Sequence, residues 1–222
     1  MNVNEISCRF ESHLIFQEIV SGYQQDNTFA VSSSRMRRFG AAAYTVGMSS
    51  NDDNETTSDT PSESLIATAY HEAGHAVMAV SLGRTIHKAT IASAKLQTGG
   101  VRLGAVKMEQ GRSGATRDWL EDEVLILFAG MVAESQFTGS YCPRGAASDL
   151  RAIERLLSTR ANTERQFEKL HRRLLDKTEY LLGDEVHEKA ITSVAEQLLE
   201  HETIKGRLVK HFLNQAISQS NK

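Results

Sequence analysis

The sequence predicts a mainly α-helical domain with a small β-hairpin or short sheet beside its first long helix. Residues 65–82 read as one helix, and apolar residues recur at helical spacing in residues 116–137. Between these runs, residues 86–91 and 100–108 read as short strands, and the Gly99-Gly100 pair marks a turn. The charged residues 163–217 read as two or three further helices.

The ends of the predicted helices follow from local signals. Ser62 or Ser64 can cap the first helix, and Glu63 then lies in its first turn. Residues 141–145 form a loop with a proline and a glycine, after which a new helix begins near Ala146. That helix carries Asp149 in its first turn.

Composition divides the 222 residues into two parts. Residues 51–60 are acidic and polar, so we expect residues 1–60 to form a largely disordered N-terminal extension. Met48 is an alternative start of the chain. Residues 61–218 are long enough to bury one sizeable core and are expected to form a single domain.

The first predicted helix contains the most informative motif, His71-Glu72-Ala73-Gly74-His75. Two histidines four residues apart project from one face of a helix and can share one metal ion. Glu72 lies beside that face, where it can act as a base toward a water on the metal's open side. This H-E-x-x-H pattern is typical of zinc peptidases, because zinc uses neutral nitrogen ligands, an open position and a nearby base.

Several blocks of the chain, in order from about residue 65 to residue 213, resemble the peptidase domain of FtsH-type zinc metalloproteases. The specific block is the helix around the motif, residues 68–77, and the weaker blocks follow it: residues 87–91, 127–134, 137–139, 145–150 and 195–204. The resemblance implies an FtsH-peptidase-like helical domain that binds one Zn²⁺ per chain. It also implies a metalloendopeptidase that hydrolyses peptide bonds in unfolded or extended polypeptide.

Asp149 is the leading candidate for the third metal ligand. A carboxylate in the first turn of a helix is held rigidly and favoured electrostatically, and the resemblance names the same position. Glu134 is the alternative, although it is better suited to accept a hydrogen bond from a metal-bound histidine. His87 precedes a strand and is expected to be exposed at the rim. The zinc-peptidase subclass with a third histidine six residues after the second is excluded by Ser81.

With zinc held by His71, His75 and Asp149, the pKa of a bound water falls toward neutrality and Glu72 can take its proton. The resemblance implies that substrate adds as a strand beside an edge strand, here residues 86–91. The resemblance also leaves open that copies of this chain assemble into a homo-oligomer.

FtsH-type proteins also carry a membrane anchor and an ATPase. This sequence has no apolar stretch near 18 residues and no G-x-x-x-x-G-K-[ST] loop. We therefore expect no membrane span and ATP-independent cleavage of peptides or unfolded segments, unless a separate ATPase partner feeds the enzyme.

A net charge of −3 gives no electrostatic argument for binding nucleic acid or an anionic membrane. Only two cysteines, Cys8 and Cys142, argue against a disulfide scaffold. We expect a cytoplasmic protein, while basic residues near position 36 leave organellar import open. Cys142 has two readings: a thiolate that blocks the open metal position, or a small buried side chain.

A second class of function stays open. The chain could be a non-catalytic or partner-dedicated FtsH-peptidase-like module that binds zinc and works with a separate ATPase or regulator. Glu72 argues against a purely non-catalytic role. A structural zinc site would also use four protein ligands rather than three.

Overall fold

The structure, a computed structural model, describes residues 62–95, 101–108 and 118–221. This part of the chain is mainly helical with one small antiparallel sheet, which confirms the predicted fold class. Its helices are α2 (Glu63–Ser81), α3 (Trp119–Thr138), α4 (Ala147–Leu157), α5 (Glu164–Leu182), α6 (Glu185–His201) and α7 (Gly206–Ser220). Its strands are β1 (Ile86–Lys95), β2 (Val101–Met108) and β3 (Thr203–Lys205). The expected N-terminal extension lies outside the described residues, and the domain boundary at residue 60 stays a prediction.

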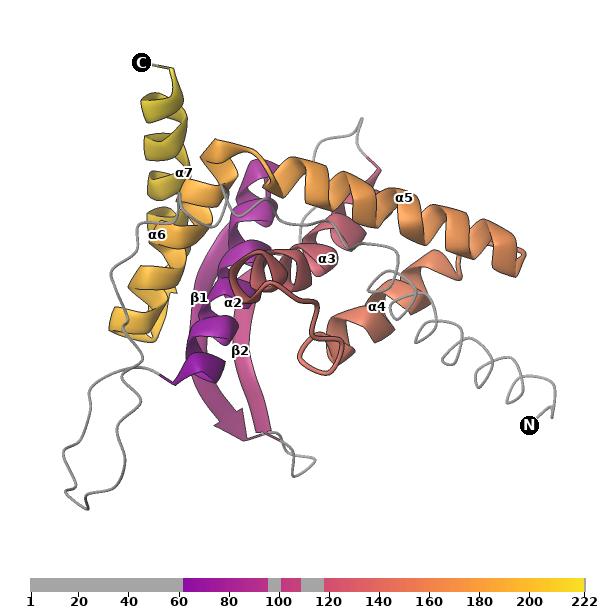
Figure 1. The fold of residues 1–222 in the computed structure, drawn as a ribbon, viewed down its shortest axis with the longest axis horizontal. Coiled ribbons are helices and arrows are strands. Elements are labelled where there is room, and N and C mark those ends of the chain that lie inside the picture. Colours follow the sequence, from indigo (N-terminus) through magenta and orange to yellow (C-terminus); the bar gives the residue numbers. More distant parts are fainter. Residues whose placement is uncertain (1–61, 96–100, 109–117, 222) are drawn as a thin grey trace. The chain divides into compact units, whose positions relative to one another are not determined.

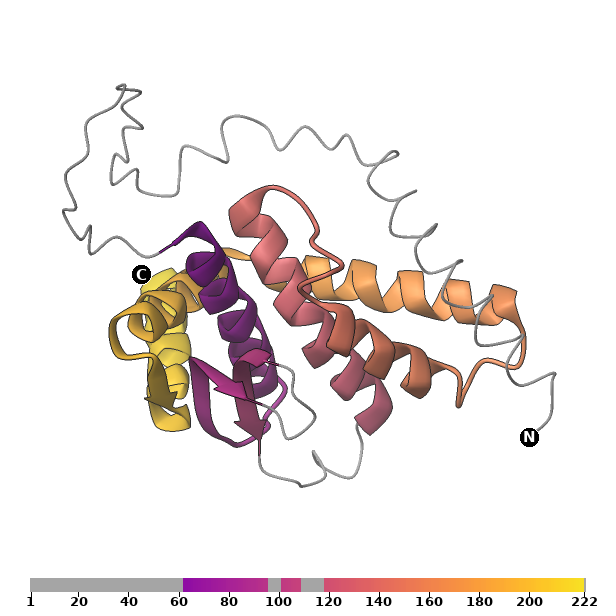
Figure 2. The ribbon, with the colours of Figure 1, turned by 90° about the horizontal axis from the view of Figure 1, so that it is seen from below.

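Helix α2 lies at the centre of this domain. It contacts α3, α6, α7 and both long strands. In Figures 1 and 2, α6 and α7 lie on one side of α2, whereas α3 lies on the other side and leads to α4 and α5. The Ser62 hydroxyl caps α2 by accepting a hydrogen bond from the Leu65 N–H, and Glu63 occupies the first turn as expected. Among the described residues, no helix is both long and apolar enough to span a membrane.

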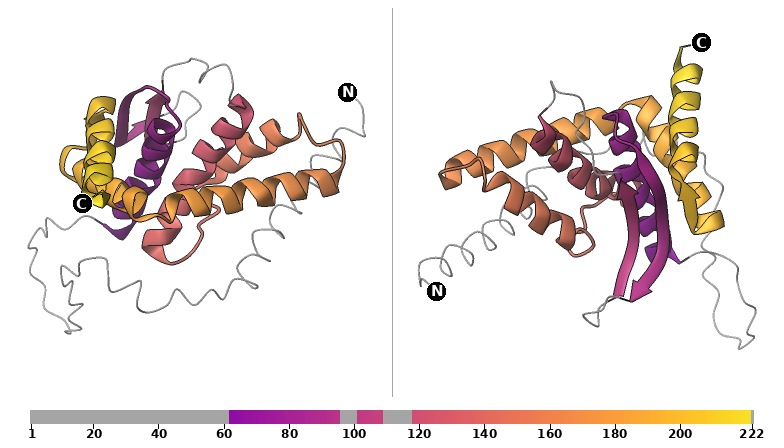
Figure 3. Two further views of the ribbon diagram at one scale, coloured as in Figure 1. Left: turned by 90° about the horizontal axis from the view of Figure 1, so that it is seen from above. Right: turned by 180° about the vertical axis from the view of Figure 1, so that it is seen from behind.

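The sheet has the strand order β2-β1-β3, and its two long strands lie beside α2 (Figure 3). The sequence does not predict strand β3, because residues 163–217 read as helices throughout. Helix α6 ends at His201, because its C-cap Glu202 has a φ of 54°, and β3 then pairs with residues 88–90 of β1. The expectation that residues 86–91 form an edge strand is therefore wrong, since β1 is paired on both sides at residues 88–90. Among the described strands, β2 and the three-residue β3 are therefore the two outer strands, one on each side of β1.

Helix α5 packs against α3 through a buried aromatic contact. His171 is 1% exposed, and its ring meets the Phe128 ring edge to face, with ring centroids 5.0 Å apart. Burial lowers the pKa of His171 to about 4, because the charged imidazolium loses its hydration in this apolar surrounding. His171 is therefore neutral in the folded protein at neutral pH.

The low pKa of His171 predicts a pH-dependent stability. Below about pH 6.5 the unfolded chain binds a proton that the folded chain does not bind until the pH approaches 4. The free energy of unfolding should therefore fall as the pH drops from about 6.5 to about 4, by an amount on the order of a few kcal/mol. His171→Leu should show a shallower fall in urea titrations across this window. Parallel curves for parent and variant would contradict this assignment.

Candidate metal centre

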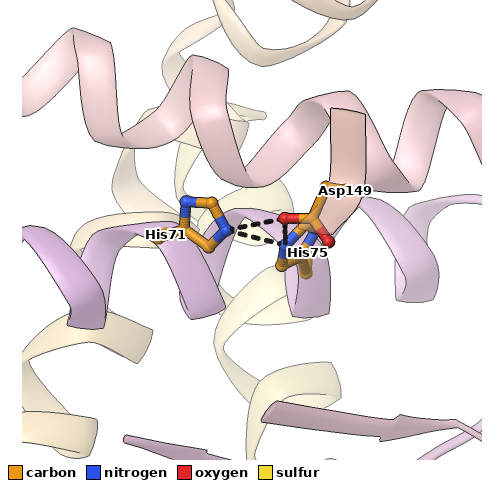
Figure 4. A group of neighbouring side chains, drawn as sticks. All are labelled: His71, His75 and Asp149. Carbon is orange, nitrogen blue, oxygen red and sulfur yellow. Dashed lines mark hydrogen bonds and ion pairs between the residues drawn. The ribbon is translucent and has the colours of Figure 1, made fainter. Parts of the chain in front are cut away.

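The structure brings three predicted metal ligands together at the junction of α2 and α4. His71 and His75 project from one face of α2, and Asp149 reaches them from the first turn of α4 (Figure 4). The two Nε2 atoms lie 3.1 Å apart. Asp149 Oδ2 lies 3.1 Å from His71 Nε2 and 3.4 Å from His75 Nε2. One ligand atom from each side chain therefore faces a common point, and such a group can hold a metal ion.

Hydrogen bonds on the far side of each ring set the histidine tautomers. His75 Nδ1 lies 2.7 Å from the Ile126 carbonyl oxygen, which can only accept, so Nδ1 carries the proton. His71 Nδ1 lies 2.9 Å from Glu134 Oε2 and donates to that carboxylate. When both rings are neutral, each presents the lone pair of its Nε2 atom to the Asp149 carboxylate. Three acceptors converge here, and a cation between them satisfies all three.

The pKa values of the cluster reflect this excess of acceptors. Burial lowers the pKa of His71, but hydrogen bonds to Asp149 and Glu134 outweigh burial and raise the pKa to about 9. Burial raises the pKa of Asp149, but hydrogen bonds from His71 and His75 hold it well below its usual range. The Asp149 and Glu134 carboxylates therefore stabilise a positive charge on the imidazole that lies between them. A metal cation competes with a proton for the same nitrogen atoms.

Glu72 is buried at 5% exposure and follows His71 directly in α2. Its carboxylate lies against the backbone of β2 at Gly104, where an added Cβ atom would lie 2.7 Å from Glu72 Cγ and Cδ. On the other side of α2, the α3 backbone at Gly130 is equally close to the histidines. An added Cβ atom there would lie 2.8 Å from His71 Nε2.

Sequence reasoning missed both glycines. A glycine inside a strand pattern such as residues 100–108 signals a bulge or a close backbone approach, and this signal was present at Gly104. Gly130 lies inside the apolar helix pattern, where its cost relative to alanine points to a packing reason. Neither signal says which side chain lies opposite, because that depends on tertiary structure.

The other candidates lie outside the cluster or behind it. Glu134 contacts the Nδ1 side of His71 rather than the shared point, which fits the hydrogen-bonding role expected for it. His87 is exposed on β1, as expected. Cys142 is an exposed free cysteine, so the expectation of a buried side chain is wrong. Among the described residues, the grouped ligands are His71, His75 and Asp149 alone.

A second arrangement resembles a catalytic triad but links two helices. Ser81 Oγ lies 2.9 Å from His187 Nε2, and His187 Nδ1 lies 2.7 Å from Asp184 Oδ2. A serine nucleophile also needs free backbone N–H groups to stabilise an oxyanion. Here the N–H groups of the three residues after Ser81 all donate to carbonyls of α2. Asp184 is also the N-cap of α6, so the chain of hydrogen bonds fixes the end of α2 to the start of α6.

Gly130 offers a test of the close approach between α3 and the histidines. Gly130→Ala should weaken Zn²⁺ affinity about 10- to 100-fold, because the new methyl group displaces the two rings. With the metal chelated, the rings can turn away and the loss of stability should be modest. Isothermal titration with Zn²⁺ and thermal melts in chelator measure the two effects.

Gly74→Ala is the matched control, since its methyl group would meet the α3 backbone, with the Ala129 carbonyl carbon 3.0 Å away. The backbone cannot turn away, so Gly74→Ala should lower the melting temperature in chelator more than Gly130→Ala does. Parent-like Zn²⁺ affinity in Gly130→Ala would refute the ligand geometry.

Comparison with known families agrees with this geometry. The family model described as peptidase family M41 matches residues 60–163. The matched region includes the three grouped residues and Glu72, and it ends before α5. The match supports an FtsH-type M41 peptidase domain in residues 60–163.

Proposed function

We propose that this protein is a zinc-dependent endopeptidase that hydrolyses peptide bonds in unfolded or extended polypeptide. One observation carries the proposal. The Nε2 atoms of His71 and His75 and a carboxylate oxygen of Asp149 converge within 3.1–3.4 Å of one another, beside the buried Glu72. The match of residues 60–163 to the model of peptidase family M41 supports a peptidase of this kind.

The donor set fits zinc better than the hard cations Mg²⁺ and Ca²⁺. Two imidazole nitrogens and one carboxylate oxygen are typical zinc ligands, whereas Mg²⁺ and Ca²⁺ use oxygen ligands. Three protein ligands leave a fourth position for water or substrate, as catalytic zinc sites do. The hydrogen bonds from His71 to Glu134 and from His75 to the Ile126 carbonyl would hold both rings in the binding orientation.

Each residue of the site has a distinct role in this proposal. A zinc ion held by the three ligands would polarise the scissile carbonyl and lower the pKa of the attacking water. Glu72 takes the proton from that water and passes it to the leaving nitrogen. Glu134 keeps the proton of His71 on Nδ1, so that Nε2 remains a ligand. The low exposure of Glu72 limits its contact with bulk water.

Strand β2 is the proposed substrate-binding edge, in place of residues 86–91. Strand β1 is paired on both sides at residues 88–90, whereas β2 is the longer of the two outer strands, β2 and β3, in the described sheet. It also passes directly over the Glu72 carboxylate at Gly104. Backbone pairing along a strand recognises extended chains with little side-chain preference. Folded proteins lack such free segments and should resist cleavage.

Glu72→Gln tests the proposed base. It should bind one Zn²⁺ per chain with parent affinity and lose hydrolysis of an unfolded protein by about 10²- to 10⁴-fold, since only proton transfer is removed. The parent should cleave the unfolded substrate and leave a tightly folded protein intact, and a chelator should abolish cleavage. Ser81→Ala serves as the control and should keep parent activity. Near-parent activity in Glu72→Gln, or its loss in Ser81→Ala, would refute the assignment; an inactive parent would favour the non-catalytic module.

A comparison of two carboxylates tests the ligand set. Asp149→Ala removes a direct ligand and should weaken Zn²⁺ binding more strongly than Glu134→Ala. Loss of Glu134 removes only the hydrogen bond to His71 and should cost about 10- to 100-fold in affinity. Competition titrations with a chromophoric chelator give both constants. The reverse order would make Glu134 the third ligand.

A further inference from the structure

Gly104 occupies a place in β2 where two independent constraints require glycine. Its φ is +78°, a backbone conformation that residues with a side chain rarely adopt. An added Cβ atom would also stand 2.7 Å from Glu72 Cγ and Cδ, and closer still to Oε1, whereas real Cβ contacts stay above about 3.0 Å. The backbone of β2 therefore lies directly against the carboxylate of the proposed base.

An irregularity in the sheet accompanies this contact. Thr90 pairs with Ala105 and Ser93 pairs with Leu103, so two residues of β1 lie opposite the single residue Gly104. Such a bulge bends the strand and increases its twist, and bulges are frequent beside active sites. The bulge thus coincides with the point where β2 meets Glu72.

Hydrogen bonds on the β3 side of β1 hold the bulge in place. The Ile91 N–H donates to the Glu202 carbonyl over 2.9 Å, and the Ala92 N–H donates to Thr90 Oγ1 over 3.2 Å. Thr90 Oγ1 in turn donates to the same Glu202 carbonyl. These bonds connect the positive-φ residue at the end of α6 to the bulge opposite Gly104.

We propose that Gly104 is a positioning residue for Glu72, with the bulged β1–β2 ladder holding the β2 backbone against the carboxylate and so restricting where that carboxylate can lie. The proposal rests on the proposed function, because it assigns the restraint to the base of that reaction. A carboxylate that must reach an attacking water tolerates little displacement, since a shift of about 1 Å can cost about 10²-fold in rate.

Two other glycines allow the effect of the positive φ at Gly104 to be measured apart from the effect of its contact with Glu72. Gly83 and Gly139 both have a φ of +80°, and an added Cβ atom at either position would have nothing within 4 Å. Alanine at these positions therefore introduces the same backbone strain without a steric clash. Any effect of Gly104→Ala beyond theirs reports the contact with Glu72.

A stability cycle tests the contact without reference to activity. In the parent, Gly104→Ala should lower the Tm of the full chain more than Gly83→Ala does. In a Glu72→Ala background the crowding side chain is gone, so the loss of Tm should shrink to about that of Gly83→Ala. Should Gly104→Ala fail to fold alone, Glu72→Ala should restore folding. An equal loss of Tm in both backgrounds, or no rescue of folding, overturns the proposal.

Steady-state kinetics on the zinc-loaded full chain test the positioning role. Gly104→Ala should keep one Zn²⁺ per chain and a KM within about threefold of the parent, while kcat falls about 10²-fold or more. Gly83→Ala and Gly139→Ala should keep the parent kcat. Parent-like kcat in Gly104→Ala, or an equal fall in the controls, overturns the proposal. If the parent protein hydrolyses no peptide, that result refutes the proposed function instead. The stability cycle alone then decides whether Gly104 restricts the position of Glu72.

Discussion

The close approach of α3 to α2 is the constraint on which the rest of the domain depends. At Gly74 the two helices leave no space for a Cβ atom, and at Gly130 the backbone of α3 lies against the imidazole rings. The short distance between α2 and α3 lets the Ile126 carbonyl and the Glu134 carboxylate of α3 reach the Nδ1 atoms of the two histidines of α2. A wider spacing would leave both rings free to turn, and the shared Nε2 point would be lost.

The second constraint is electrostatic. Glu72, Glu134 and Asp149 lie around two histidines in a largely buried setting, where unpaired carboxylates are costly. The raised pKa of His71 and the lowered pKa of Asp149 both show that the arrangement retains a positive charge at its centre. A proton can supply that charge at one nitrogen only. A divalent ion neutralises more of the surrounding charge, which is why this cluster fits a metal better than an internal ion pair.

Local features of the fold could be predicted from the sequence, whereas long-range pairings could not. The H-E-x-x-H motif of residues 71–75 lies on a helix whose capping residue is also a local signal, and the i, i+4 geometry fixes which face both histidines share. Strand β3 is three residues long and forms only because β1 is available as a partner. The sequence therefore offers no alternation of apolar and polar residues long enough to predict it. For the same reason, the central place of β1 and the contacts of Gly104 and Gly130 could not be predicted from sequence.

The position of β3 has a consequence for the site that reaches beyond one missed strand. By pairing with β1 at residues 88–90, it covers the strand that the sequence suggested for substrate and leaves β2 as the longer of the two outer described strands. The Glu202 carbonyl, at the turn into β3, also accepts the hydrogen bond that fixes the bulge opposite Gly104. Residues that lie beyond the matched peptidase region therefore support the geometry around Glu72. The end of α6 and β3 are thus hydrogen-bonded to the bulged strand β1, opposite the Gly104 backbone that lies against Glu72.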